Sequence, residues 1–248
     1  MNQASKICWV EDLGLVPYLP ACEWQQRLVQ ARKAGAIPDV LLLCEHPHVI
    51  TLGRNGKRDN LRVNGRLLAQ QNVEFHPTDR GGDITYHGPG QIVGYPILDL
   101  ADHRRDVRWY VNQLEEIMIR AAADFGIQAK RDAAHRGVWV AAPSGDEKLA
   151  ALGVHLSRWI TSHGFAFNVS TDLRYFDWIV PCGIAGCRAT SLEKLLGRAV
   201  RSEEVKPRLM AHFAEVFGSK LETVTVEELT RALPAQEESA AGKLVAAS

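Results

Sequence analysis

The segment EKLAALGVHLSRWITSHGFAFNVSTDL, residues 147–173, contains two apolar runs that are separated by turn residues. A third short run, GVWVAA at residues 137–142, precedes them. Short apolar runs between turn residues are typical of strands that follow one another in an antiparallel sheet. We therefore expect three consecutive antiparallel strands in this part of the chain.

Helices are predicted before these strands. Trp24, Leu28 and Ala31 recur at helical spacing, and Gly35 can end that helix in a left-handed conformation. A longer apolar stripe occupies residues 107–125 and stops before a glycine. Both segments have the pattern of helices that bury one face against a sheet.

Two further segments have the composition of buried strands. Residues 39–55 are expected to form a strand, a turn and a second strand, and residues 91–100 another strand. Helical signals return later, where Thr190 and Thr225 are each followed three residues on by glutamate, as in a capping box. Strands clustered between helices predict an α+β fold, with helices flanking a mixed, mostly antiparallel sheet.

Chain length and composition indicate one globular domain. The 248 residues are 46% hydrophobic, which is enough for a substantial core. We expect a single domain over residues 1–233, a catalytic core over 35–219 and a flexible tail over 234–248, where the sequence lacks a sustained apolar face. The chain gives no signal for its oligomeric state, and we expect a monomer.

Charge and cysteine usage limit the classes of partner and compartment. Twenty-nine Lys and Arg residues balance 29 Asp and Glu residues, so nucleic acid or an anionic membrane is not expected as a partner. The sequence has neither a secretory-type start nor an apolar run of the roughly 18–20 residues needed to span a bilayer. Five irregularly spaced cysteines argue against a disulfide framework. Together these features predict a cytoplasmic protein with reduced thiols.

A glycine-rich segment, RGGDITYHGPGQIVGYPI at residues 80–97, is a candidate binding site. Its glycines let the backbone approach a ligand closely on both sides of a short strand, and Arg80 and His87 supply donors at its ends. The spacing matches neither a dinucleotide fingerprint nor a P-loop. A substrate cradle, a phosphate cradle and two purely structural glycine turns all remain possible at this point.

Lys148 begins the apolar strand face that continues with Ala150, Leu152 and Val154. Burial there disfavours the ammonium, whereas a nearby thiolate favours it. The alternative is a lysine at a strand end whose ammonium reaches water.

The segment SHGFAFNV, residues 162–169, alternates in the same way. His163, Phe165 and Phe167 are expected on a core face, and Gly164 and Ala166 on a nearly bare face that suits a slender ligand or a tight backbone crossing.

Cys182, in IVPCGIAGCRATSLEK at residues 179–194, can be a buried core residue, half of a disulfide, a metal ligand or a nucleophile. A cysteine taken alone is most often a small buried residue, and the turn formed by Pro181 and Gly183 weakens that interpretation here, because loops often carry chemistry. Cys44, His46 and His48 lack a second pair at zinc-ligand spacing, so no metal is expected. Cys187 is expected to be a packed thiol.

Three motifs together resemble the lipoyl(octanoyl) transferases of lipoate biosynthesis: residues 80–95, 147–173 and 179–193, in the family's order. The similarity extends from about Val40 to about Phe217. It implies the biotin/lipoate protein ligase catalytic fold and a thioester exchange that needs no cofactor. Cys182 stands where the family has its nucleophile, and Lys148 where it has the residue that lowers the pKa of that thiol.

The resemblance also implies an acyl site and protein substrates. The donor is acyl carrier protein, and the acceptors are lipoyl domains of 2-oxoacid dehydrogenase E2 subunits and the glycine cleavage H protein. We add His163 as a positioning candidate. The implied acyl site comprises the substrate-binding strand, Arg80, Gly81, Gly82, Asp83, Ile84, Thr85, Tyr86 and His87, and the positions where the family lines the acyl group, Ala151, Leu152, Gly153, Gly164, Phe165 and Ala166.

Three other functions are weighed against this acyl transfer. An ATP-dependent lipoate or biotin protein ligase shares the fold and needs no cysteine nucleophile. A noncatalytic module would bind a lipoyl domain or acyl carrier protein without turnover. A cysteine hydrolase using His163 lacks an orienting Asn or Asp in the sequence pattern.

Overall fold

The computed structural model describes residues 6–143, 145–180 and 187–233 of the chain. Within these ranges, nine strands form the main sheet in the order β12-β1-β2-β6-β10-β9-β8-β7, and β11 pairs with β9. Its strands are β1 (Lys6–Leu15), β2 (Asp39–Glu45), β6 (Gln91–Ile97), β7 (Ala129–Lys130), β8 (Val138–Val140), β9 (Glu147–Ser157), β10 (Ile160–Asn168), β11 (Arg188–Ala189) and β12 (Ser219–Thr223).

The predicted mixed, mostly antiparallel sheet is confirmed. β1 runs parallel to both of its neighbours, β2 and β12, and β11 runs parallel to β9, whereas the other pairs are antiparallel. The consecutive strands β8, β9 and β10 are antiparallel, as their short apolar runs predict. A smaller sheet contains β4 (Glu74–Pro77), β3 (Val49–Leu52) and β5 (Ile84–His87).

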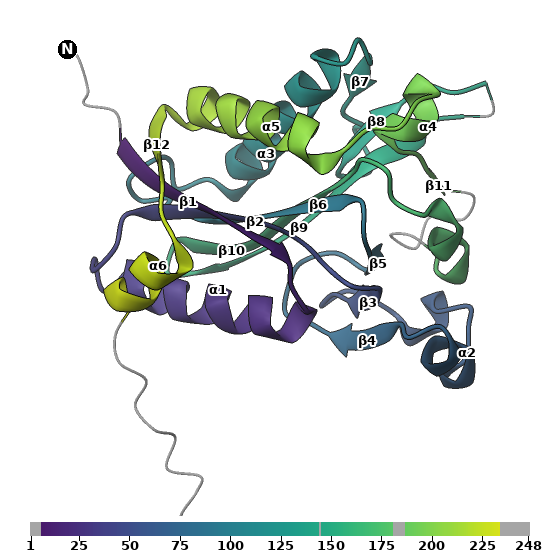
Figure 1. Cartoon of the computed structure of the whole chain (residues 1–248), viewed down its shortest axis with the longest axis horizontal. Coiled ribbons are helices and arrows are strands. Elements are labelled where there is room, and N and C mark those ends of the chain that lie inside the picture. The colour runs from purple at the N-terminus through teal and green to yellow at the C-terminus, as the bar shows by residue number, and fades with distance from the viewer. Residues whose placement is uncertain (1–5, 144, 181–186, 234–248) are drawn as a thin grey trace, which may run out of the picture.

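Helices cover both faces of the main sheet (Figure 1). α3 and α5 pack on one face around the larger apolar core, and α1 and α6 pack on the other. The helices are α1 (Tyr18–Lys33), α2 (Gly65–Gln70), α3 (Val107–Ala123), α4 (Leu192–Leu196), α5 (Ser202–Phe217) and α6 (Val226–Ala232), and the short 3₁₀ helices are η1 (Arg58–Asn60) and η2 (Leu173–Trp178).

Local stop signals position these helices as the sequence indicates, with one exception. Gly35 and Gly126 have φ of 68° and 77° after α1 and α3, a conformation that glycine adopts without strain. Thr225 caps α6 as predicted. The capping box at Thr190 is wrong, because Ser191 is the cap of α4 and its side chain accepts a hydrogen bond from the Lys194 N–H.

A bulge in β9 changes the predicted face of Lys148. Val138 pairs with Ala150 and Trp139 with Lys148, so Leu149 is an extra residue in the ladder. Lys148 therefore does not share a face with Ala150, which packs in the core beneath α3 and α5. The expected row of Lys148 with Ala150, Leu152 and Val154 is wrong for this physical reason.

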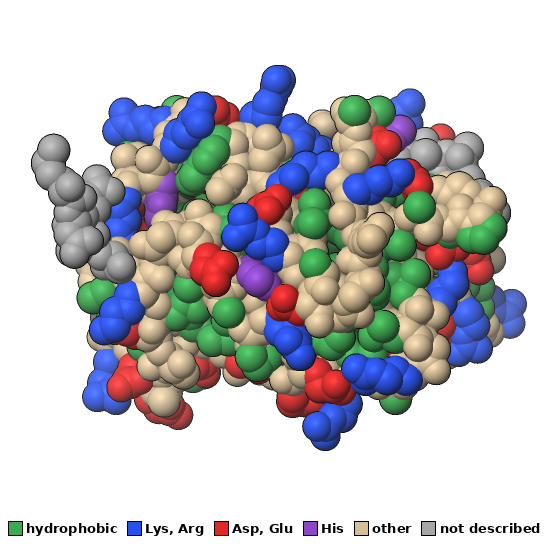
Figure 2. All heavy atoms as spheres, turned by 90° about the horizontal axis from the view of Figure 1, so that it is seen from above, with side chains coloured by type: hydrophobic (Ala, Val, Ile, Leu, Met, Phe, Trp, Pro, Cys, Tyr) green, Lys and Arg blue, Asp and Glu red, His purple; other side chains and the backbone are tan. Residues whose placement is uncertain are grey.

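No helix in the described part of the chain is both long and apolar enough to cross a bilayer. Basic and acidic side chains are interspersed over the described surface that faces the viewer in Figure 2, in line with the balanced composition. The predicted tail, residues 234–248, lies outside the described residues.

Candidate active site

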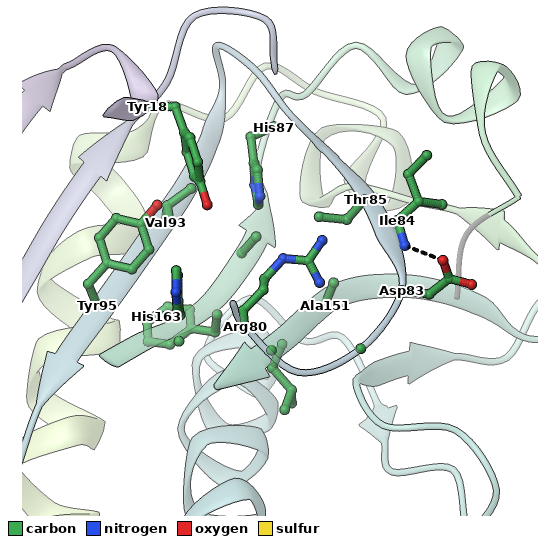
Figure 3. A pocket seen from close by; sticks show the side chains of 16 residues that line it. Tyr18, Arg80, Asp83, Ile84, Thr85, His87, Val93, Tyr95, Ala151 and His163 are labelled. Carbon is green, nitrogen blue, oxygen red and sulfur yellow. Dashed lines mark hydrogen bonds between the residues drawn. The ribbon is translucent and has the colours of Figure 1, made fainter. Parts of the chain in front are cut away.

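A narrow cavity of about 50 Å³ opens where β5 and the preceding glycine-rich loop approach β9 and β10 (Figure 3). Most of the predicted acyl-site residues line it. They are Arg80, Gly82, Asp83, Ile84, Thr85, His87, Ala151, Leu152, Gly153, Gly164, Phe165 and Ala166. Three distant segments of the chain are thus brought to one site, which we call the narrow cavity.

Two residues of the predicted set do not line the narrow cavity. Tyr86 alternates away from it, is fully buried in the core of the small sheet and stacks on Tyr175 with ring centroids 4.8 Å apart. Gly81 supplies only backbone, and its N–H donates to the Val154 carbonyl at 2.9 Å. Alternation along β5 explains why Thr85 and His87 face the cavity while Tyr86 does not.

The tight backbone crossing predicted for the bare face on β10 is confirmed, and the same face also lines the narrow cavity. Gly164 lines the narrow cavity, yet a Cβ there would collide with the Gly94 carbonyl oxygen of the adjacent strand. A Cβ on Gly153, its cross-strand partner, would lie 2.6 Å from the Gly81 carbonyl oxygen. Glycine is therefore required at these positions by backbone packing, and Ala166 is the bare-face residue with a side chain of its own.

The Arg80 side chain is hydrogen-bonded within the protein. Its side chain is buried, and Nε and Nη2 donate to Thr51, with Nη2 2.8 Å from the Thr51 carbonyl oxygen. Asp83 lies at the same loop, where Oδ2 accepts from the Asn60 amide at 2.6 Å and Oδ1 accepts from the Ile84 N–H at 2.7 Å. The loop therefore presents one cation and one carboxylate to the narrow cavity, and both are already hydrogen-bonded to other parts of the protein.

A buried hydrogen-bond chain fixes the orientation of His87. The Asn168 amide donates to the Thr190 carbonyl at 2.9 Å, and the Gln91 amide donates to Asn168 Oδ1 at 2.8 Å. Gln91 Oε1 therefore accepts from Nδ1–H of His87 at 2.7 Å, which leaves Nε2 as an acceptor. Burial, followed by the nearby charges, lowers the pKa of His87 to about 3, so the ring is neutral near pH 7.

A second buried pair closes one end of the narrow cavity. His46 Nδ1 donates to the Val16 carbonyl, so Nε2 accepts from the Tyr95 hydroxyl, with both distances at 2.7 Å. Burial holds the pKa of Tyr95 well above its usual value, which keeps the hydroxyl protonated. His46 is thus engaged in hydrogen bonds, and within the described ranges no group of three or more His, Cys, Asp or Glu side chains forms a metal site.

Lys148 lies in a small neighbouring cavity, which we call the lysine cavity. It is lined by Thr85, Gln91, Lys148, Ala151, Ala166, Asn168, Phe176, Cys187 and Ala189. Its residues Thr85, Ala151 and Ala166 also line the narrow cavity, so the two are adjacent. Because of the bulge in β9, the lysine points to this side of the sheet.

The Lys148 side chain is 6% exposed, and its Nζ lies 4.5 Å from the centre of the Trp139 ring. A cation over an aromatic face is stabilised by the ring quadrupole. The alternative of a lysine whose ammonium reaches open water is therefore wrong.

Cys182, the predicted nucleophile, lies outside the described residues. The next cysteine along the chain, Cys187, is half-buried and lines the lysine cavity. It is less enclosed than the packed thiol that the sequence predicts, because it faces this cavity.

Three further residues line the narrow cavity without being among the predicted site residues: Tyr18, Val93 and Tyr95. Tyr18 belongs to the first turn of α1, and its hydroxyl donates to Thr78 Oγ1 at 3.2 Å. Tyr95 lies within the glycine-rich segment, but the sequence pattern predicts it to be a buried residue of a core strand. His163, proposed as a positioning residue, lines the narrow cavity beside Tyr18.

The fold and this site define a catalytic domain of the lipoyl protein ligase type. Residues 17–214 match the family described as "Lipoyl protein ligase A/B catalytic domain". An "Octanoyltransferase" of Solibacter usitatus is 52% identical over 86% of this chain and 94% of its own, and one of Caldicellulosiruptor saccharolyticus is 45% identical over 90% and 93%. The chain belongs to this family and, within it, to the octanoyltransferases, which are acyltransferases.

Solved structures show the same fold at low identity. A bipartite lipoate protein ligase from Thermoplasma acidophilum superposes with a TM-score of 0.70 at 14% identity, over 92% of this chain and 91% of that one. A lipoate-protein ligase A solved with ATP gives a TM-score of 0.68 at 14% identity, over 92% and 93% of the two chains. The predicted biotin/lipoate ligase fold is confirmed.

Proposed function

We propose that this acyltransferase moves an octanoyl group from the phosphopantetheine thioester of acyl carrier protein to the ε-amino group of a lysine on a lipoyl domain. The acceptors are the lipoyl domains of 2-oxoacid dehydrogenase E2 subunits and the glycine cleavage H protein. The reaction uses no cofactor beyond the donor's phosphopantetheine. The observation that carries the proposal is a buried lysine in a cavity that adjoins the narrow cavity, where Val93, Phe165 and Ala166 provide apolar surface for an alkyl chain.

In the first half-reaction, the Cys182 thiolate attacks the octanoyl carbonyl carbon. A new C–S bond forms, the bond to the pantetheine sulfur breaks, and the departing thiolate takes a proton from the Lys148 ammonium. The alkyl chain lies along β10, past Ala166 and Gly164, where Val93 and Phe165 contribute apolar surface. Burial of this chain is the main source of binding free energy for the acyl group.

In the second half-reaction, the acceptor lysine amine attacks the Cys182 thioester. An amide bond forms, the Cys182 thiolate leaves, and the neutral Lys148 amine takes the proton of the attacking nitrogen. One buried lysine thus gives up a proton in the first step and regains it in the second. The low-dielectric surroundings of Lys148 strengthen its interaction with a neighbouring thiolate.

His87 is proposed to orient the substrate through hydrogen bonding. Its pKa is too low for it to carry a proton between groups near pH 7, but its Nε2 is a fixed acceptor at the narrow cavity. An N–H of the pantetheine arm or of the attacking amine is a matching donor.

The principal test follows acyl transfer directly. Incubation with octanoyl-acyl carrier protein is expected to add one octanoyl group to the enzyme, and later addition of a lipoyl domain removes it. Omission of ATP and Mg²⁺ leaves both steps unchanged. An absolute need for ATP would instead identify an adenylating ligase on the same fold, and tight binding of both proteins without any transfer would identify a binding module.

A further inference from the structure

A third cavity lies beyond the end of the narrow cavity that is remote from Lys148. This polar cavity has a volume of about 380 Å³ between α1 and the ends of β9 and β10. It shares Tyr18 and His163 with the narrow cavity, just as the lysine cavity shares Ala166 at the opposite end. Along β10, the three cavities therefore follow one another from Asn168 to Ser162.

The dimensions of this series match a short acyl chain. The lysine cavity meets β10 at Asn168 and Ala166, so a carbonyl in it lies at the level of Phe167, from which the strand advances about 10 Å to Gly164 at roughly 3.3 Å per residue. An octanoyl chain, with C–C bonds of about 1.5 Å, spans roughly 9 Å when extended. A chain whose carbonyl lies near Lys148 thus has its methyl end close to His163. Figure 3 shows Tyr18, Tyr95 and His163 together at that end of the narrow cavity, away from Thr85 and Ala151.

His163 is placed there by an unusual backbone conformation. Its φ is 55°, in the left-handed region that a histidine seldom adopts, so its side chain leaves the core face predicted from strand alternation and turns to the cavity. The conformation is held by a hydrogen bond from the His163 N–H to Gln25 Oε1 at 2.7 Å. The ring is fixed in turn, because Nε2 donates to Asp79 Oδ1 at 2.7 Å.

The polar cavity behind this pair is a poorer environment for an alkyl chain than the narrow cavity, because charged and amide groups line it together with Leu19, Val29 and Pro77. Its described lining includes Asp79, His155 and Gln25, and the Gln25 Nε2 atom is buried with no hydrogen-bond partner among the described residues. A longer chain has to break the contact of His163 with Asp79 and then displace water from these groups. Both steps cost free energy that the added methylenes recover only in part.

We propose that the His163–Asp79 pair is the end stop that sets the acyl chain length of this enzyme. The inference rests on the proposed function, because it takes the reacting carbonyl to lie at the Lys148 end. Tyr18 forms the other side of the stop. Removal of the pair joins the narrow cavity to the 380 Å³ polar cavity and admits chains of about twelve carbons, which are roughly 5 Å longer than octanoyl.

The test compares chain lengths in competition. Wild type and variants receive an equal mixture of octanoyl- and dodecanoyl-acyl carrier protein, and intact mass gives the ratio of the two acyl-enzymes. His163→Gly opens the stop and suits the left-handed backbone, so it should fold. Asp79→Ala releases the histidine ring and changes a carboxylate that is 62% exposed. His212→Ala is the control, since His212 is paired with Asp124 at 2.8 Å but lines none of the three cavities.

The octanoyl-to-dodecanoyl ratio is expected to fall about tenfold in His163→Gly, because one charge-assisted hydrogen bond at the stop is lost. It is expected to fall less in Asp79→Ala. In His212→Ala the ratio stays at the wild-type value. Octanoyl adducts in every variant with an unchanged ratio would overturn the end stop alone. The absence of any acyl-enzyme in wild type would instead overturn the proposed function, and the end stop with it.

Discussion

Ala166→Leu tests whether the narrow cavity holds the acyl chain. Ala166 is 4% exposed and lines both the narrow cavity and the lysine cavity, so a larger side chain there obstructs the passage between them. It lies one residue from Phe167, where the reacting carbonyl is placed, or about 3 Å along the strand, which is about a third of the way along a bound octanoyl chain of roughly 9 Å. The leucine therefore displaces the outer part of the chain.

The magnitude follows from the burial that is lost. Three to four outer carbons leave the cavity, at about 0.8 kcal/mol for each, which amounts to about 3 kcal/mol or roughly a hundredfold in kcat/KM. A butanoyl donor ends near Ala166 and should lose far less. The substitution therefore changes the preferred chain length and does not simply inactivate the enzyme.

The assay measures kcat/KM for butanoyl- and octanoyl-acyl carrier protein, with circular dichroism to verify folding. Ala123→Leu, at an exposed position at the end of α3, is the matched control and is expected to match wild type. An octanoyl kcat/KM within twofold of wild type in Ala166→Leu would refute the placement of the chain. So would equal losses for the two donors.

Two further substitutions test the packing and the charge state of the site. Gly164→Ala forces a Cβ onto the Gly94 carbonyl oxygen and should lower the free energy of unfolding by about 3 kcal/mol. The control Gly65→Ala has open space around it and should change the free energy of unfolding little. Equal urea midpoints for the two variants would contradict this expectation. His87 binds a proton below about pH 6.5 in the unfolded chain but only near pH 3 in the folded protein, so stability falls by about 1.4 kcal/mol per pH unit as pH decreases through that window. His87→Gln should remove this component, and identical pH slopes of unfolding free energy in the two proteins would show that the ring is not buried and neutral.

Local patterns predict the secondary structure well because local interactions decide it. The helical spacing of Leu28 and Ala31 places α1, and the apolar runs from residue 137 onward place β8, β9 and β10. Gly35 ends α1 because glycine itself readily adopts the left-handed conformation that is needed there. The two motifs that line the narrow cavity, residues 80–95 and 147–173, are likewise visible in the sequence, because each is rich in residues with little or no side chain.

The features that the sequence does not predict depend on pairing between strands. The bulge at Leu149 arises from the register of β8 against β9, and it reverses the face of Lys148. The left-handed backbone of His163 is stabilised by Gln25, which is 138 residues away along the chain. Tyr18 reaches the cavity only because α1 packs across β10, so no motif of its own marks it.

In the proposed reaction, Cys182 carries the octanoyl group, and Lys148 gives up a proton in the first step and regains one in the second. The most direct measurement is intact mass of the enzyme after brief exposure to octanoyl-acyl carrier protein, with peptide mapping of the adduct, for wild type, Cys182→Ala, Cys187→Ala and Lys148→Met. We predict one octanoyl group on Cys182 in wild type and in Cys187→Ala, none in Cys182→Ala, and formation slowed by about a hundredfold or more in Lys148→Met. An octanoyl adduct that forms at the wild-type rate in Cys182→Ala, or in Lys148→Met, would contradict the account.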